Sequence, residues 1–208
     1  MVPVEIVITG TLPLLLHSQE GMNRANPDAR ELSILNKKRS KQDDDYQRIA
    51  DLEMRLGVYW DRKRDRAVMP AFNVIRSLQD GGKHMKLGRK IIQGIRISPH
   101  CTEFDVRYSP RLSFEEFVVA PQHRDSRTVV VSGTVLRTRP RFDTWELVGI
   151  LLRDPDMLSP DDLNAAIQKA GLYEGIGDFR VGTPRGGRYG TYTGHTRDLG
   201  AEEVEKWS

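Results

Sequence analysis

The sequence predicts an α+β fold, because strand-like and helix-like segments alternate along its 208 residues. Val4, Ile6 and Ile8 recur with the period of a strand, and apolar residues recur at helical spacing in residues 70–78 and 159–170. In chain order the elements read as a strand, a helix, a hairpin, a helix and a strand, with long insertions. That order is the βαββαβ plan of a ferredoxin-like or RNA-recognition fold, which covers one sheet face with two helices and leaves the other for a ligand.

The first strand covers residues 4–9 and leads through residues 12–16. Residues 18–60 then predict a helical insertion of two helices. Ala29, Leu32 and Leu35 fit the first helix. Asp43 is the expected cap of the second, Gly57 is its expected end, and its apolar stripe is Tyr46, Ile49, Leu52 and Leu56.

The middle of the chain predicts a hairpin-like segment over residues 58–68, with its turn at 62–65. Pro70 suits the first turn of a following helix, and Gly81 and Gly82 are expected to stop that helix. Its expected buried stripe is Phe72, Ile75 and Leu78. Residues 81–127 read as an irregular insertion, with short strands between residues 95 and 119.

The last third predicts a strand over residues 128–138 and an antiparallel partner over 145–152. Ser159 is expected to cap a helix that Gly171 stops, and residues 187–193 are expected to form an edge strand. We therefore expect one domain over residues 1–208. Its core covers about residues 1–17, 65–80 and 128–193, and its insertions cover about residues 18–60 and 81–127.

The charges are segregated, although the formal net charge is only +3. Basic residues form clusters near residues 37–41, 62–66, 83–90 and 180–188, whereas acidic residues gather at 43–45, 154–162 and 202–205. A single basic cluster is usually a solvated face. Several together are typical of a protein that binds a polyanion, so they favour nucleic acid as the partner.

Composition excludes several other classes. The single cysteine, Cys101, excludes an intramolecular disulfide, and the histidines lack the spacing of metal ligands, so we expect neither a metal site nor a cofactor. The apolar start lacks a basic leader and carries Glu5, unlike a signal peptide, and no run reaches membrane-spanning length. These observations predict a cytoplasmic protein without a membrane partner.

The most unusual segment is residues 171–192, GLYEGIGDFRVGTPRGGRYGTY, which holds seven glycines, three arginines and four aromatic residues. Glycine allows close backbone approach, arginine contacts phosphate and aromatic rings stack on bases. The segment follows a helix and contains no Walker lysine, so it is not a nucleotide-binding fingerprint. The alternative is a mobile surface loop without a ligand.

Three features together resemble the RAMP superfamily of CRISPR-associated RNA-binding proteins. The glycine-rich loop lies between the last helix and the last strand. Residues 65–78, DRAVMPAFNVIRSL, are similar to the strand and proline that lead into the first helix of the backbone subunits. The first strand ends in Leu16-His17-Ser18 before a large insertion, as in that family. The chain departs from the usual Gly-Ser-Ser-like turn, which reads Ala71-Phe72-Asn73 here, so it resembles a short solitary or phage-type relative.

The resemblance implies a homo-oligomer or filament, in which repeated copies assemble along a single strand. Phosphates would pass the glycine loop, the first core helix and the basic segment behind that helix. Carried over by position, the implied nucleic-acid-binding residues are Asn73, Arg76, Lys83, Lys86, Lys90, Gly175, Gly177, Arg180, Gly182, Arg185 and Arg188.

We therefore expect a non-enzymatic protein that binds single-stranded nucleic acid, with RNA as the family default. One alternative is a phage single-stranded DNA-binding protein for replication or recombination, located in the host cytoplasm. A second is a metal-independent RNA endonuclease using His17, because a histidine serves as general acid or base in RAMP nucleases. A third is an assembly protein whose basic clusters meet acidic partner surfaces.

Overall fold

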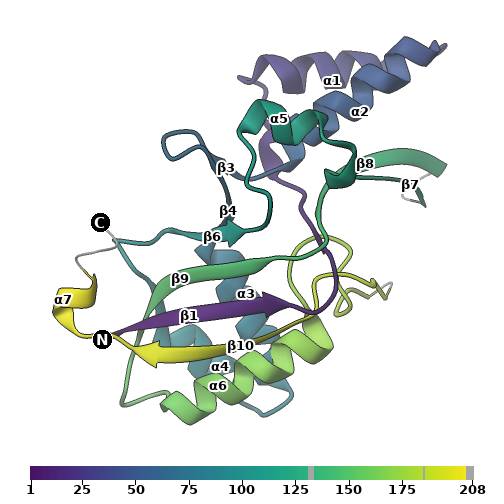
Figure 1. The fold of residues 1–208 in the computed structure, drawn as a ribbon. Helices are drawn as coiled ribbons and strands as arrows, with labels where there is room; N and C mark the ends of the chain where they lie inside the picture. The colour runs from purple at the N-terminus through teal and green to yellow at the C-terminus, as the bar shows by residue number, and fades with distance from the viewer. Residues whose placement is uncertain (131–133, 185, 205–208) are drawn as a thin grey trace. The chain divides into compact units, whose positions relative to one another are not determined.

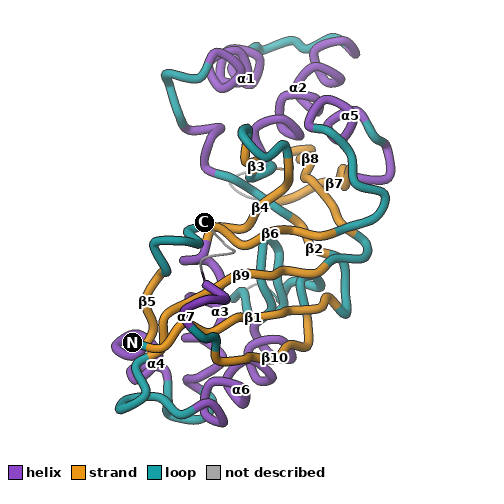
Figure 2. The backbone as a smooth tube through the Cα atoms, turned by 60° about the vertical axis from the view of Figure 1, so that its left-hand side comes forward, coloured by secondary structure: helices purple, strands orange, loops and turns teal. Residues whose placement is uncertain are grey.

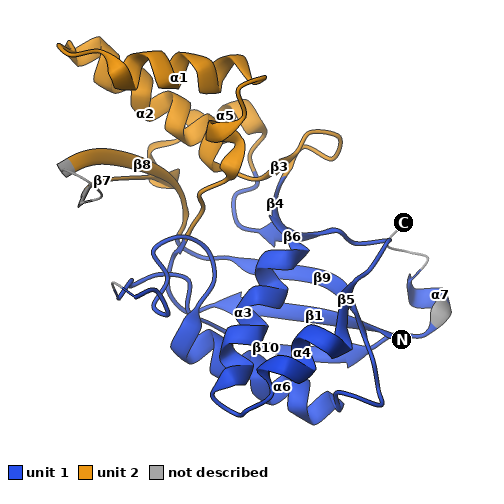
Figure 3. Ribbon diagram, turned by 180° about the vertical axis from the view of Figure 1, so that it is seen from behind, with its two compact units in different colours: residues 1–14, 67–111, 143–208 blue, residues 15–66, 112–142 orange. Residues whose placement is uncertain are grey.

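The computed structural model describes residues 1–130, 134–184 and 186–204. The fold is mixed α+β with antiparallel sheets, which confirms the broad class that the sequence predicts. The chain divides into two compact units, each assembled from separate stretches of sequence (Figure 3). Unit 1 comprises residues 1–14, 67–111 and 143–208, and unit 2 comprises residues 15–66 and 112–142.

Unit 1 is built on an antiparallel sheet that joins the two ends of the chain to its middle (Figure 2). Its strand order is β10-β1-β9-β6-β4, and the short strand β5 also pairs with β9. The strands are β1 (Val2–Gly10), β4 (Arg66–Pro70), β5 (Ile95–Ile97), β6 (Glu103–Arg107), β9 (Glu146–Arg153) and β10 (Tyr192–Asp198). The first strand therefore lies inside the sheet, between β10 and β9.

The alternation in β1 decides which of its faces joins the core. Val4, Ile6 and Ile8 are buried, whereas the residues between them keep part of their surface. The register sets Ile6 opposite Gly149 of β9. Each buried aliphatic side chain stabilises the fold by about 1.5–3 kcal/mol, so a slip of one residue would strongly destabilise the sheet.

Two helices cover one face of this sheet, side by side (Figures 1 and 3). Helix α3 (Ala71–Lys83) lies in sequence between β1 and β6, and α6 (Pro160–Lys169) connects β9 to β10. A shorter helix, α4 (Gly88–Gly94), packs beside α3, and α7 (Ala201–Val204) follows β10.

The buried stripe of α3 differs from the predicted one. Ala71, Val74 and Leu78 are buried, but Phe72 is 56% exposed and Ile75 only partly buried. Positions 71, 74 and 78 also fit the helical period, and a shift of one residue turns the face by about 100°. The prediction that Phe72 faces the core is therefore wrong.

Neither of the two core helices ends at the glycine that the sequence predicts. Helix α3 continues through Gly81, where a Cβ atom would lie 2.4 Å from the backbone nitrogen of Ala170. Gly81 thus allows close packing against the π turn η3 (Ala170–Glu174) instead of ending the helix. Ser159 caps α6 as predicted, but the chain stays helical through η3 and leaves the helix at Gly175.

Unit 2 contains the helical insertion and a β-hairpin. Its helices and strands are η1 (Gln19–Met22), α1 (Pro27–Lys37), α2 (Asp43–Gly57), β3 (Trp60–Asp61), α5 (Phe114–Val119), η2 (Pro121–His123), β7 (Arg124–Val130) and β8 (Thr134–Phe142). A three-stranded sheet has the strand order β2-β8-β7. Strand β2 covers Leu14–Leu15, and unit 2 begins at its second residue. The two helices predicted in residues 18–60 are confirmed.

Helices α1 and α2 pack through most of the predicted apolar stripes, but Tyr46, which the sequence places in the stripe of α2, is 50% exposed. Their shared core consists of Ala29, Leu32, Ile49, Leu52 and Leu56, with Leu35 packed against it. The N-cap of α2 is Gln42, not Asp43. The backbone N–H of Gln42 donates to the carboxylate of Asp45 (2.8 Å) and completes a capping box. Buried Glu53 of α2 accepts hydrogen bonds from the Arg137 side chain (2.6 Å) and the Thr138 backbone (2.7 Å) and so holds α2 against β8.

Three strand assignments are corrected. The single strand predicted over residues 128–138 is the end of β7 and the start of β8, which pair antiparallel; residues 131–133 lie outside the described residues. In the large sheet β9 instead pairs with β1 and with β6, one of the short strands predicted between residues 95 and 119. The last strand begins at Tyr192, five residues after the predicted start.

Candidate functional site

The glycine loop, defined here as residues 175–191, connects η3 to β10 within unit 1 (Figure 1). Backbone hydrogen bonds join its two arms. Ile176 donates to the carbonyl of Gly190 (2.9 Å), and Arg188 donates to the carbonyl of Phe179 (3.0 Å). The loop therefore folds back on itself, with Arg185 outside the described residues.

Two of its glycines are required by this self-packing. A Cβ atom on Gly190 would lie 1.8 Å from the carbonyl oxygen of Ile176, and one on Gly187 would lie 1.9 Å from that of Phe179. Gly186 is different, because a Cβ atom there would meet no atom within 4 Å. Internal packing thus explains Gly187 and Gly190, and close approach of a ligand to this backbone stays a prediction.

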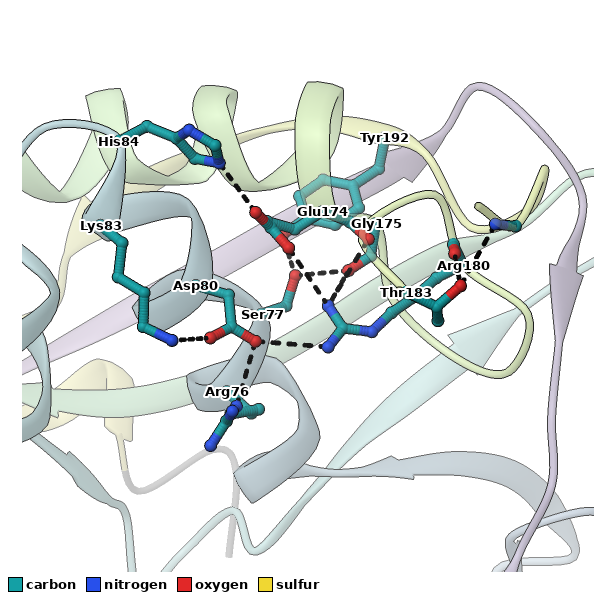
Figure 4. A network of polar contacts seen from close by, with 11 residues as sticks. Arg76, Ser77, Asp80, Lys83, His84, Glu174, Gly175, Arg180, Thr183 and Tyr192 are labelled. Atoms are coloured by element: carbon teal, nitrogen blue, oxygen red, sulfur yellow. Dashed lines mark hydrogen bonds and ion pairs between the residues drawn. The ribbon is translucent and has the colours of Figure 1, made fainter. Parts of the chain in front are cut away.

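Three cationic side chains converge on the carboxylate of Asp80 (Figure 4). Arg76 Nε (3.0 Å) and Arg180 Nη2 (3.3 Å) both donate to Asp80 Oδ2, and Lys83 Nζ donates to Oδ1 (2.6 Å). The Asp80 side chain is only 9% exposed, whereas those of Arg76 and Lys83 are 61% and 57% exposed. The buried carboxylate therefore orients two largely solvent-exposed cations.

The pKa of Asp80 reflects two opposing causes. Burial alone raises the pKa of the carboxyl group, but the hydrogen bonds from Lys83, Arg76 and Arg180 outweigh burial and lower it below the ordinary value of 3.8. Asp80 is therefore ionised at neutral pH, as its three cationic partners require.

A second carboxylate, that of Glu174, lies on the other side of Arg180 (Figure 4). Glu174 Oε2 is 3.9 Å from Arg180 Nη1, and Glu174 Oε1 is 2.7 Å from His84 Nε2. The ring of His84 lies 5.2 Å from that of Tyr173. Arg180 thus has a carboxylate on each side and is a bridge between α3 and η3.

A buried hydroxyl pair anchors the start of the loop to the core. Ser77 Oγ donates to the carbonyl of Gly175 (2.8 Å) and lies 2.8 Å from Tyr192 Oη. Burial raises the pKa of Tyr192 well above its ordinary value, so this phenol stays neutral and keeps its proton for hydrogen bonding. The first residue of the loop is consequently fixed relative to α3 and β10.

No protein-family model matches this chain, and no curated protein has a matching sequence. Any functional assignment therefore depends on the residues and geometry of the chain itself.

The structure brings together three of the predicted binding residues, Arg76, Lys83 and Arg180, and sets the others differently. Asn73 is half-buried, and its amide contacts the sulfur of Met69 (3.4 Å). Three other predicted residues are exposed: Lys86, Lys90 and Arg188. The predicted glycines belong to the glycine loop: Gly175, Gly177 and Gly182. A nucleic-acid contact by any of these residues stays a prediction.

His17 belongs to unit 2 and is exposed. Its backbone oxygen accepts a hydrogen bond from Tyr59 Oη (3.4 Å), and within the described ranges no acid–base partner of its imidazole is found. Across the same residues, no group of three or more His, Cys, Asp or Glu side chains is placed to hold a metal ion. No described helix is long and apolar enough to cross a membrane.

Sequence reasoning missed Asp80 and Glu174. A local signal existed for Asp80, because Arg76 and Lys83 stand four residues before and three residues after it, which are the spacings of ion pairs on a helix face. No local signal existed for Glu174, whose partner His84 lies 90 residues away in the chain.

Proposed function

We propose that unit 1 is a ferredoxin-like βαββαβ core of the kind found in the RAMP superfamily. The proposal is supported by the chain order β1, α3, β6, β9, α6 and β10, and by the antiparallel strand order β10-β1-β9-β6. In this arrangement both helices connect strands of one sheet and pack on the same face. Strand β4 adds an outer strand beyond this plan.

We propose that unit 1 binds single-stranded nucleic acid along α3 and the glycine loop, without cleaving it. The observation that carries this proposal is the convergence of Arg76, Lys83 and Arg180 on the single carboxylate of Asp80. Three cations exceed the two carboxylates of Asp80 and Glu174, so positive charge remains after the internal ion pairs are formed.

The geometry leaves donors available on the exposed side chains. Arg76 contacts Asp80 through Nε, and among the described residues its two terminal nitrogens make no further hydrogen bond. Lys83 has three donors and gives one to Asp80. Terminal guanidinium nitrogens suit the paired oxygens of a phosphate, and the contact that Asp80 makes at Nε reduces the entropy lost on binding.

The test is fluorescence anisotropy with labelled single-stranded RNA and DNA of 20 or so nucleotides at low salt. Changing Arg76 and Lys83 together to alanine should weaken binding about tenfold, from two exposed ionic contacts of about 0.7 kcal/mol each. Arg197→Ala is the matched control, because Arg197 is also in unit 1, also ion-paired and 55% exposed. An equal loss of affinity in the double variant and in Arg197→Ala would contradict the proposed site.

The same preparation distinguishes the remaining alternatives. Sequencing the nucleic acid that co-purifies with the protein separates an RNA partner from the phage-type single-stranded DNA alternative. A single-turnover assay in EDTA tests cleavage: product from the wild type but not from His17→Ala would overturn a non-enzymatic function. Absence of binding to every single-stranded oligonucleotide at low salt would favour an assembly protein instead.

A further inference from the structure

Phe72 is a large aromatic side chain that the packing of unit 1 does not use. It occupies the first turn of α3 and is 56% exposed, while its neighbour Ala71 is fully buried. In the part of the chain that the structure describes, the Phe72 ring makes no aromatic or cation–π contact. Burying such a ring would stabilise the fold, and this chain leaves much of that stabilisation unrealised.

Phe72 shares one face of α3 with the cationic cluster. Arg76 follows it after four residues, Asp80 after eight and Lys83 after eleven, all on one side of a helix with 3.6 residues per turn. Successive members from Phe72 to Asp80 are about 6 Å apart along the helix axis. An aromatic ring is thus followed, one turn later, by an exposed guanidinium group.

This order matches the chemistry of a nucleotide, which joins a flat base to a phosphate. An apolar protein surface is a poor occupant, because Arg76 lies one helical turn from the exposed ring and such a surface would have to desolvate its charge. A polyanion that carries aromatic bases satisfies both the ring and the charges.

We propose that Phe72 is a base-stacking residue, on which an unpaired base lies while Arg76 contacts an adjoining phosphate. The inference rests on the proposed nucleic-acid binding and adds the requirement for unpaired bases. In a duplex the base faces are covered by their neighbours, so Phe72 selects single strands over double strands. Stacking accepts every base, so it contributes affinity without sequence preference.

The experiment compares three fluorescent 20-nucleotide probes by anisotropy: an oligothymidylate, a backbone of the same length with abasic sites throughout, and a duplex. Phe72→Ala should weaken binding of oligothymidylate about 5- to 150-fold, which corresponds to the usual effect of losing one stacked base. Phe72→Trp should keep the affinity. For the abasic probe, the wild type and Phe72→Ala should bind equally.

Leu172→Ala is the control, because Leu172 is another exposed apolar side chain of unit 1 (62% exposed) and should leave all three affinities unchanged. Circular dichroism confirms that each variant is folded. Unchanged affinity of Phe72→Ala for oligothymidylate would overturn the inference while leaving the proposed function in place. Absence of wild-type binding to every probe would instead overturn the proposed function.

The other possible partner of the exposed Phe72 ring is a second copy of this chain. If the ring were at a dimer interface, sedimentation velocity without nucleic acid would show a dimer for the wild type and a monomer for Phe72→Ala. That result, together with unchanged oligonucleotide affinity, contradicts base stacking.

Discussion

Asp80 links the stability of unit 1 to its exposed charge. Its carboxylate is almost fully enclosed and accepts hydrogen bonds from two side chains of α3 and one of the glycine loop. Without that carboxylate, Arg180 would remain largely buried beside Glu174 alone, and the exposed cations would lose their orientation. One acidic residue therefore connects the glycine loop to α3 and orients the cationic face.

Asp80→Asn should lower the free energy of unfolding by about 1–2 kcal/mol at pH 7, because the charge of the group that accepts the three hydrogen bonds is lost. The loss stays modest because two of the three cations are exposed and screened by solvent. The folded-state pKa of Asp80 lies below its ordinary value of 3.8, so its stabilisation is fully present above that value. The difference between wild type and variant should stay constant from pH 7 to about pH 5 and shrink as pH falls through the lowered pKa.

Urea unfolding at a series of pH values measures this difference. Asp156→Asn is the control, because Asp156 is exposed and its side chain makes no hydrogen bond or ion pair among the described residues. A difference that grew as the solution became more acidic would contradict the role assigned to Asp80.

At the scale of elements, the glycine loop is a packed structure with unequal glycines. Gly190 and Gly186 share a positive φ, 68° and 63°, so alanine is strained at both. Only at Gly190 would the added Cβ atom also overlap a backbone carbonyl, that of Ile176.

Gly190→Ala should therefore destabilise the protein by about 3 kcal/mol or more, and Gly186→Ala by about 1 kcal/mol, the cost of the left-handed conformation alone. Chemical denaturation of both variants gives the comparison, with Gly186→Ala serving as the matched control. Similar losses for the two variants would show that the loop does not have the self-packed path described above.

The elements that sequence predicts best are those determined by local chemistry. The cap at Ser159, the proline that follows it and the apolar stripes of α1 and α2 all act within a few residues, and all except Tyr46 are found as predicted. Within the candidate site, composition singled out the basic cluster that contains Lys83 and the glycine loop, whereas Arg76 was implied by the RAMP resemblance.

The errors arise where distant segments decide. Residues 128–138 are rich in β-branched residues and resemble one strand, although Ser132-Gly133 is itself a turn signal. Strand β6 alternates charged residues with buried Phe104 and Val106, but it is only five residues long, and its place in the sheet depends on pairing with β9, about 40 residues later. Phe72 and Glu174 were misjudged for the same reason, because their environments depend on tertiary contacts.

At the scale of the whole molecule, long-range pairing assembles both units. Strand β1 pairs with β10, so the sheet of unit 1 is complete only after nearly the entire chain has been synthesised. Unit 2 likewise combines residues 15–66 with residues 112–142. The prediction of one domain with two insertions remains untested, and so does assembly of repeated copies along a strand.

Binding to a single strand should depend on salt with a slope set by the number of phosphate contacts. If Arg76, Lys83 and Arg188 each neutralise one phosphate, the logarithm of the association constant should fall with the logarithm of salt concentration at a slope of about −2, since each contact contributes about −0.7. Changing Arg76 and Lys83 to alanine should make the slope less steep by about 1.4.

Two other variants should leave the slope unchanged. Arg197→Ala removes no proposed phosphate contact, and Phe72→Ala should lower the affinity at every salt concentration without altering the slope, because stacking releases no counterions. Anisotropy titrations at four or five salt concentrations measure all four slopes, and an unchanged slope in the double variant would place the phosphate contacts outside α3.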